Sequence, residues 1–254
     1  MALVQLAPGL DVRRSADRFR TRTAELDSAY SFSFAEHYDG ANTSHGLLLA
    51  HNEFVVQPGA GFARHPHREM EIVTWVLQGA LAHEDSAGSR GVVRPGLVQR
   101  LSAGTGVLHA ETNDAWRLEG GDPSAEPVHF VQMWLAPDEQ GGGPGYDVHE
   151  VGDALQEGDL VPVASGMPRH SEALRLRNRS AALHAARLEP GQSVELPEAR
   201  YLHLFVARGE VVMEGAGPLA TGDAVRSTGT GGHRVTATGP AELLVWEMHA
   251  ALGG

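Results

Sequence analysis

Short apolar runs, many of them with polar residues at every second position, occupy most of the chain. Between residues 46 and 134, runs such as 72–77 (Ile-Val-Thr-Trp-Val-Leu) are separated at short intervals by Gln-Gly, Ser-Ala-Gly, Arg-Pro-Gly and Gly-Thr-Gly. Few segments keep the 3.6-residue period of an amphipathic helix. Many short strands joined by tight turns are typical of a sandwich or barrel, not of a fold with alternating strands and helices. The pattern therefore predicts an all-β protein with few short helices.

The second half of the chain repeats the turn pattern of the first half. Pro-Gly occurs at 58–59 and again at 190–191, and Gly-Thr-Gly occurs at 104–106 and again at 229–231. The spacing between equivalent turns changes only from 132 to 125 residues, which indicates one β unit used twice. A segment rich in Gly, residues 138–145, is the best candidate for a linker. We predict two tandem domains, residues 1–137 and 138–254.

Four residues of metal-ligating type occur in the first half as two pairs with the same spacing. His65 and His67 form one pair, and His109 and Glu111 form the other. In a strand, residues two apart point to the same face. Two neighbouring strands carrying these pairs would direct three imidazoles and one carboxylate at a single point. The spacing therefore predicts a metal site made of His65, His67, His109 and Glu111.

The second copy of the repeat serves as an internal control on this interpretation. Because the chain has 14 histidines, about one His-x-His pair is expected by chance. In the second copy, however, Pro197 and Ala199 occupy the positions of the first pair, and His233, near the position of His109, has no ligand-type neighbours. We expect a metal in the first domain and none in the second.

The ligand set limits the metal and the kind of site. Three imidazoles and a carboxylate suit iron, nickel, copper, cobalt, manganese or zinc, and they do not suit calcium. Closed structural zinc sites are usually rich in thiolates, whereas this chain has no Cys. We expect one divalent ion per chain, iron(II) before the others, with positions open to water, substrate or dioxygen.

Three further side chains near these pairs have more ordinary interpretations. Glu71 follows His67 by four residues, so it is a candidate fifth ligand or a hydrogen-bond acceptor for a metal-bound imidazole. His83 and Asp85 form another pair two residues apart, just before a Gly turn. We expect them to be structural, with hydrogen bonds near the end of a strand.

Composition and charge exclude several classes of function. The formal net charge of −12 opposes binding to nucleic-acid phosphates. All 20 basic residues are Arg, so no lysine can form a Schiff base or bind phosphate in a Walker loop. The Arg clusters at 13–22 and 175–179 are expected to be solvated faces paired with acidic residues, with phosphate binding as the alternative. The N-terminal segment lacks a signal-peptide core, and no run reaches the roughly 18 apolar residues of a membrane span. We expect a cytoplasmic protein without direct nucleic-acid or membrane contacts.

The first half resembles the cupin signature, and more specifically the pirin family of the bacterial two-cupin type. The first cupin motif is matched by Gly59, residues 65–67 and Glu71, and the second by residues 104–106, His109 and Asn113, with small changes in loop length. The segments that carry the resemblance to pirins are 31–39, 52–53, 65–71, 83–86, 102–111 and 132–134. They follow the family's order over residues 30–135, whereas the second half matches only in outline.

The resemblance implies a fold, a site and an activity. It implies two facing jelly-roll-like cupin domains, with the metal only in the first, held by His65, His67, His109 and Glu111. It also implies the quercetin 2,3-dioxygenase activity of bacterial pirins. In that reaction the flavonol 3-hydroxyl loses its proton and binds the metal, dioxygen adds, and the central ring opens with loss of carbon monoxide. Glu111 would then be the catalytic residue, since its carboxylate could both bind the metal and accept this proton. The expected reactants are therefore a flavonol-like aromatic molecule and dioxygen.

Two other functions stay open at this point. One is a non-enzymatic regulator that senses metal or redox state and binds a partner protein, because the second copy keeps a fold without a metal site and could offer a docking surface. The other is a cupin isomerase or hydrolase that uses zinc at the same four residues.

Overall fold

The computed structural model of the protein describes residues 6–253, and it is almost entirely β. The described residues contain one short α-helix and two 3₁₀ turns: η1 (Ser15–Asp17), α1 (Trp116–Glu119) and η2 (Ala154–Glu157). None of the helices in this range has the length and apolar character needed to cross a membrane. Residues 1–5, on which part of the expectation about a signal peptide depends, lie outside the described range. The predicted all-β class is confirmed.

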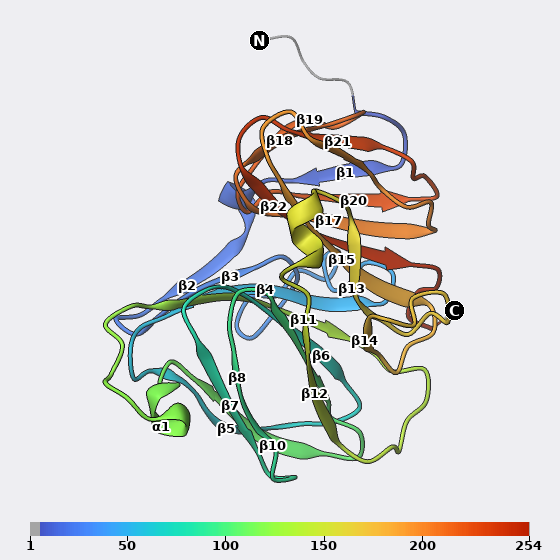
Figure 1. Ribbon diagram of the computed structural model, residues 1–254. Coiled ribbons are helices and arrows are strands. Elements are labelled where there is room, and N and C mark those ends of the chain that lie inside the picture. The colour runs from blue at the N-terminus through green and yellow to red at the C-terminus, as the bar shows by residue number, and fades with distance from the viewer. Residues whose placement is uncertain (1–5, 254) are drawn as a thin grey trace.

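Two sheets, one of seven strands and one of four, form the first domain in the lower half of Figure 1. The larger sheet has the order β12 (Gly145–Glu150), β9 (Leu97–Ser102), β6 (Glu71–Gln78), β11 (Val128–Leu135), β4 (Leu48–Val56), β3 (Leu26–Tyr30) and β2 (Phe19–Arg22). The smaller sheet has the order β5 (Gly61–His67), β10 (Val107–Thr112), β7 (Leu81–Asp85) and β8 (Arg90–Val93).

The second domain, in the upper half of Figure 1, repeats this plan. Its larger sheet has the order β1 (Leu10–Arg13), β20 (Ala224–Thr228), β17 (Tyr201–Arg208), β22 (Ala241–Met248), β15 (Ala181–Leu188), β13 (Val161–Ser165) and β14 (Leu174–Arg175). Its smaller sheet has the order β16 (Ser193–Glu195), β21 (Arg234–Ala237), β18 (Glu210–Met213) and β19 (Gly217–Ala220). The order β9-β6-β11-β4-β3 thus matches β20-β17-β22-β15-β13, and the two predicted cupin domains are confirmed.

The two large sheets exchange one strand each. Strand β1 precedes the first domain in the chain but pairs with β20 of the second, and β12 precedes the second domain but pairs with β9 of the first. Figure 1 shows the blue β1 among the orange and red strands, and β12 in the lower half. The sheets are therefore interlocked across residues 137 and 138, and the boundary predicted there stays a prediction.

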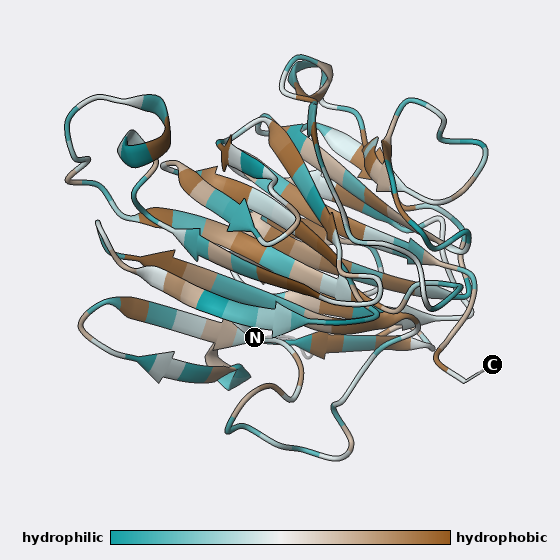
Figure 2. Cartoon of the chain, turned by 90° about the horizontal axis from the view of Figure 1, so that it is seen from below, coloured by the Kyte–Doolittle hydropathy of each residue, from teal (hydrophilic) through white to brown (hydrophobic). Residues whose placement is uncertain are grey.

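Strand β6 shows why these apolar runs are continuous. Val73, Trp75 and Leu77 belong to the core between the two large sheets, whereas Ile72 and Val76 face the interior of the first domain. A strand buried on both faces needs apolar residues at successive positions. Figure 2 shows the hydrophobic residues concentrated on the central strands and the hydrophilic ones in the loops.

Polar contacts reinforce the interface between the domains. The indole nitrogen of Trp75 donates a hydrogen bond of 2.7 Å to Glu242, and Arg208 donates one of 2.8 Å to the Leu77 carbonyl. Trp75 and Trp246 are both fully buried in the core between the sheets. Replacing such a Trp by Ala typically costs about 3–5 kcal/mol, so this core joins the domains firmly.

Candidate metal centre

The two predicted ligand pairs lie on adjacent strands of the small sheet. Strand β5 carries His65 and His67, and its neighbour β10 carries His109 and Glu111. The antiparallel register places His109 opposite His65, and an irregularity follows between His109 and Glu111. Strand β5 is the edge of its sheet, where the missing backbone donor of Pro66 is tolerated.

The three histidines of these strands converge on one point. Each offers a ring nitrogen, and these three atoms lie within 4.8 Å of one another. The Nε2 atoms of His65 and His109 are 3.1 Å apart, while Nε2 of His67 is buried and has no partner among the described residues. Nδ1 of His65 lies 2.8 Å from the Ala63 carbonyl, which can only accept, so the proton of neutral His65 sits on Nδ1. The Nε2 lone pair of His65 is thereby left for a metal.

Glu111 lies beside this group, in a buried frame of amides. Gln99 donates a hydrogen bond of 3.1 Å to one carboxylate oxygen, and Gln132 donates one of 2.5 Å to the other. Glu111 shares a second group of candidate ligands with His109 and His83, and Nδ1 of His83 is 4.0 Å from the carboxylate. His109 therefore belongs to both groups of candidate ligands, the three histidines and the group that contains Glu111. The site thus has histidine and glutamate side chains able to hold a metal.

Burial keeps two of these imidazoles neutral. Desolvation, followed by the neighbouring His109 and His65, lowers the pKa of His67 to about 4. Desolvation, followed by His65 and His83, lowers the pKa of His109 to about 3. Metal ligation requires neutral imidazole, so at neutral pH no proton has to be displaced from either ring.

The three other side chains considered near the ligand pairs have different surroundings in the structure. Glu71 is buried but accepts a hydrogen bond of 3.0 Å from the backbone of Arg177, away from the histidines. Asp85 accepts bonds from backbone amides in the turn after β7, as expected for a structural residue. His83 has the expected contact with Asp85, 3.3 Å from Nε2 to the carboxylate, but it also lies opposite Glu111 and stacks on Tyr146 of β12 at 4.5 Å.

Sequence reasoning assigned no role to Gln99 or Gln132. Both lie in the middle of strands, and the structure buries both side chains. A buried amide without a partner costs free energy, so a Gln inside a predicted core strand is a signal for a polar site. That signal was present in the chain but did not identify the acceptor.

A cavity of about 370 Å³ opens beside the histidines. Its apolar wall consists mainly of Phe34, Phe54, Phe62 and Trp134, and its polar floor includes His65, His67, Glu111 and Gln132. The volume falls in the range typical of small-molecule sites, about 300–1,000 Å³. An aromatic wall above a few converging polar groups is suited to a flat, largely apolar ligand.

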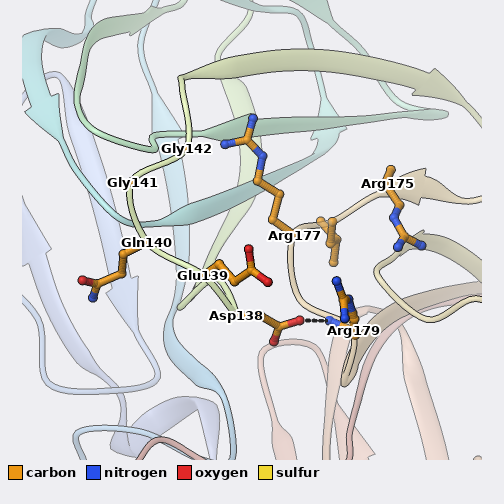
Figure 3. Close-up of a pocket in the computed structure, with 9 residues that line it drawn as sticks. Asp138, Glu139, Gln140, Gly141, Gly142, Arg175, Arg177 and Arg179 are labelled. Atoms are coloured by element: carbon orange, nitrogen blue, oxygen red, sulfur yellow. Dashed lines mark hydrogen bonds between the residues drawn. The ribbon is translucent and has the colours of Figure 1, made fainter.

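A larger groove, of about 510 Å³, lies at the linker and contains none of the predicted ligands (Figure 3). Figure 3 shows Asp138 accepting a hydrogen bond from the backbone of Arg179, and Arg177 reaching toward Gly142. The guanidinium of Arg177 donates a bond of 2.7 Å to the Gly143 carbonyl. The charged side chains of this groove are exposed, and these two hydrogen bonds connect the linker to the second domain.

The second domain contains a third group of candidate ligands, His170, His184 and Glu247. Its atoms are hydrogen-bonded to protein groups: His184 and His249 contact the Glu247 carboxylate at 2.9 and 2.7 Å, and Arg169 forms an ion pair with it. This group lies on β15, β22 and adjoining loops, not on strands equivalent to β5 and β10.

Comparison with known proteins places the chain in a family. Residues 11–135 match the pirin family, and residues 163–248 match the quercetinase C-terminal cupin domain. A protein of Mycobacterium tuberculosis, named provisionally as a quercetin 2,3-dioxygenase, is 54% identical over 244 residues, which cover 96% of this chain and 97% of the relative. The chain is a pirin. The resemblance inferred from the motifs is confirmed.

Other pirins extend the comparison. The quercetin 2,3-dioxygenase of Escherichia coli K12 is 31% identical over 93% of this chain and 97% of its own length. The crystal structure of the bacterial pirin YhhW from Escherichia coli in complex with nickel(II) superimposes with a TM-score of 0.83 at 28% identity. The alignment covers 95% of this pirin and all of YhhW, so the two share the complete fold.

Proposed function

We propose that this pirin is a metal-dependent dioxygenase that opens the central ring of quercetin-like flavonols. The observation that carries the proposal is the aromatic-walled cavity of about 370 Å³ that opens directly onto His65, His67 and Glu111. The names of the related pirins support it. A regulator without a substrate would not need such a cavity beside its metal ligands.

We further propose that His65, His67, His109 and Glu111 hold one divalent ion, with iron(II) as the first candidate and nickel as the second. The unpartnered Nε2 of His67 and the close approach of the His65 and His109 nitrogens fit such an ion. When bound, the ion supplies Lewis acidity, which lowers the pKa of a coordinated hydroxyl. Nickel is supported by the nickel(II) complex of YhhW.

The chain's own residues perform the remaining tasks. Phe54, Phe62 and Trp134 pack against the flat rings of the flavonol and exclude water from the opened ring. The carboxylate of Glu111 accepts the proton released by the flavonol hydroxyl. Gln132 donates to one oxygen of this carboxylate and keeps it in place before and after the transfer.

The test is oxygen-dependent loss of quercetin. Protein loaded with iron(II), or in a parallel series with nickel(II), is mixed with quercetin in air, and flavonol absorbance and released carbon monoxide are recorded. We expect turnover in the wild type and in His233→Ala, since His233 lies outside the cluster and contacts Thr230. We expect none in His109→Ala.

Three outcomes would redirect the proposal. Flavonol loss no faster than with metal alone would rule out quercetin as the substrate. Zinc at full occupancy in protein purified without added metal would favour an isomerase or hydrolase. Stoichiometric capture of a partner protein in only one redox state of the metal, without turnover, would favour a regulator.

A further inference from the structure

A small pocket of about 50 Å³ lies where the N-terminal segment passes between the two domains. This segment runs from β1 through η1 to β2, and Figure 1 shows it in blue, linking the upper and lower halves. The charged residues that line the pocket are four arginines and one acid: Arg13, Arg14, Arg18, Arg226 and Asp17. Arginine thus dominates a pocket that touches the segment and both domains.

Arg226 is the unusual member of this set. Its residue is only 5% exposed, and it forms no ion pair within residues 6–253. The guanidinium donates to the side-chain oxygen of Asn42 and to the Ser31 carbonyl, both at 2.7 Å, and it lies over the ring of Phe32. Its Nε is buried and has no hydrogen-bond partner in the described part of the chain. A buried cation that lacks a counter-charge is costly, so Arg226 favours an anion nearby.

The carboxylates around the pocket are already engaged or exposed. Three of the arginines each hold one carboxylate: Arg13 binds Asp11, Arg14 binds Asp223, and Arg18 binds Glu53. Asp11 lies opposite Arg226 in the β1–β20 register, but it is half exposed and turned to Arg13. Asp17 is exposed and has no ion pair within residues 6–253. Arg226 is therefore left without a carboxylate.

Arg18 contributes a second free donor. Its side chain is 4% exposed, and its terminal nitrogens donate to Glu53 and to the Ala29 carbonyl. Its Nε, like that of Arg226, is buried and has no partner among residues 6–253. Burial, followed by the charge of Arg13, lowers the pKa of Arg226 to about 10, which leaves it a cation at neutral pH.

We propose that this pocket binds one small oxyanion, of the size and charge of inorganic phosphate, between Arg226 and Arg18. The planar guanidinium group presents several N–H donors that match the oxygens of phosphate. A volume of about 50 Å³ holds one tetrahedral ion in place of a few waters but excludes a nucleotide or a sugar phosphate. Because the pocket is lined by the N-terminal segment and by both domains, the bound anion stabilises the contacts among these three parts.

Binding is tested with inorganic phosphate on the full-length, metal-loaded protein. Equilibrium dialysis with labelled phosphate should give one ion per chain. The melting temperature should rise saturably, by roughly 4–8 °C at about 100 times the Kd, when phosphate replaces chloride at constant ionic strength. An equal saturable rise with chloride alone would overturn the assignment to an oxyanion.

Matched variants locate the site. Arg226→Gln should abolish the phosphate-dependent rise, whereas Arg208→Gln should keep it, because Arg208 also donates across the domain interface but lies outside the pocket. Arg13→Gln, at an exposed position, tests the site even if Arg226→Gln does not fold, and should weaken phosphate binding by about threefold. An unchanged phosphate response in both Arg226→Gln and Arg13→Gln, or no phosphate bound to the wild type, would refute the proposal.

Discussion

The two domains each contain a cluster of histidines with a glutamate, but the clusters differ in how their nitrogens are satisfied. In the first domain the ring nitrogens of His65 and His109 face each other at 3.1 Å, and Nε2 of His67 has no partner among the described residues. In the second domain His184 and His249 both contact Glu247. Buried polar atoms normally have partners, so three converging imidazoles with an unsatisfied nitrogen indicate a site for a ligand, whereas imidazoles bonded to a carboxylate indicate a structural network.

The clusters also differ in position. The first lies on the small sheet, on β5 and β10, whereas the second uses β15 and β22 of the large sheet. The two domains thus share the same strand order, but their histidine clusters lie on different sheets. Equivalent strands do not imply equivalent chemistry.

The largest expected effect is loss of the metal from one cluster only. His109→Ala removes the ligand shared by both candidate groups, so metal affinity should fall by at least about 100-fold. Elemental analysis after dialysis against a weak chelator measures this loss. His184→Ala is the matched change in the second domain and should retain a full equivalent of metal. Equal loss in both variants would break the comparison.

The next effect concerns stability against pH in the second cluster. Burial alone would raise the pKa of Glu247, but hydrogen bonds from His184 and His249 and the charge of Arg169 outweigh it and lower the pKa to about 2. Because this folded-state value lies below the ordinary value of 4.5, the ionised carboxylate stabilises the fold above about pH 4.5. The stabilisation, about 3 kcal/mol, is lost as the pH falls from about 4.5 toward 2.

Glu247→Gln should therefore be less stable than the wild type at pH 7, and the gap should close with acid. Urea unfolding at a series of pH values measures the gap, and Glu25→Gln, at an exposed position, serves as the control. A gap that stays constant between pH 7 and pH 3 would show that the Glu247 network does not depend on its charge.

A smaller effect should follow from removing the amide that holds Glu111. Gln132→Leu leaves one carboxylate oxygen without its donor, so metal affinity should fall by about 10–100-fold while the fold persists. Competition with a coloured chelator gives the affinity. An affinity within twofold of the wild type would show that Gln99 alone positions the carboxylate.

The smallest expected effect is a difference in stability between substitutions in the two clusters, measured on metal-free protein. His67→Ala removes no hydrogen bond from a ring nitrogen to another described residue, so the free energy of unfolding should change by less than about 1 kcal/mol. His184→Ala removes a bond to a buried carboxylate and should cost about 1–3 kcal/mol. Thermal denaturation without metal compares the two, and a reversed order would contradict the distinction drawn between them.

The sequence predicted the parts of the fold that depend on local periodicity. Strand spacing placed His65 and His67 on one strand and His109 and Glu111 on another. The register that brings His109 opposite His65, and the irregularity that follows before Glu111, depend on how the two strands pair and could not be predicted from alternation. The role of His83 was not predicted, because its position opposite Glu111 depends on the pairing of β7 with β10, two strands separated along the chain by β8 and β9.

The burial of charged side chains also depends on contacts between distant parts of the chain. The Arg cluster near the N-terminus was expected to be solvated, yet the side chain of Arg18 is 4% exposed. Its guanidinium lies over the ring of Phe205 of the second domain, a contact that no pattern within residues 13–22 could indicate. Contacts across the domain interface are set by the pairing of distant edges, not by neighbouring residues.

The exchange of β1 and β12 makes the two halves mutually dependent. A cut between residues 137 and 138 would yield two fragments, each carrying a strand that belongs to the other's sheet. Either fragment alone would leave the edge of β9 or β20 unpaired, and an exposed edge strand invites association with another chain. The molecule therefore has the pairing of a swapped dimer whose two subunits have been fused into one polypeptide.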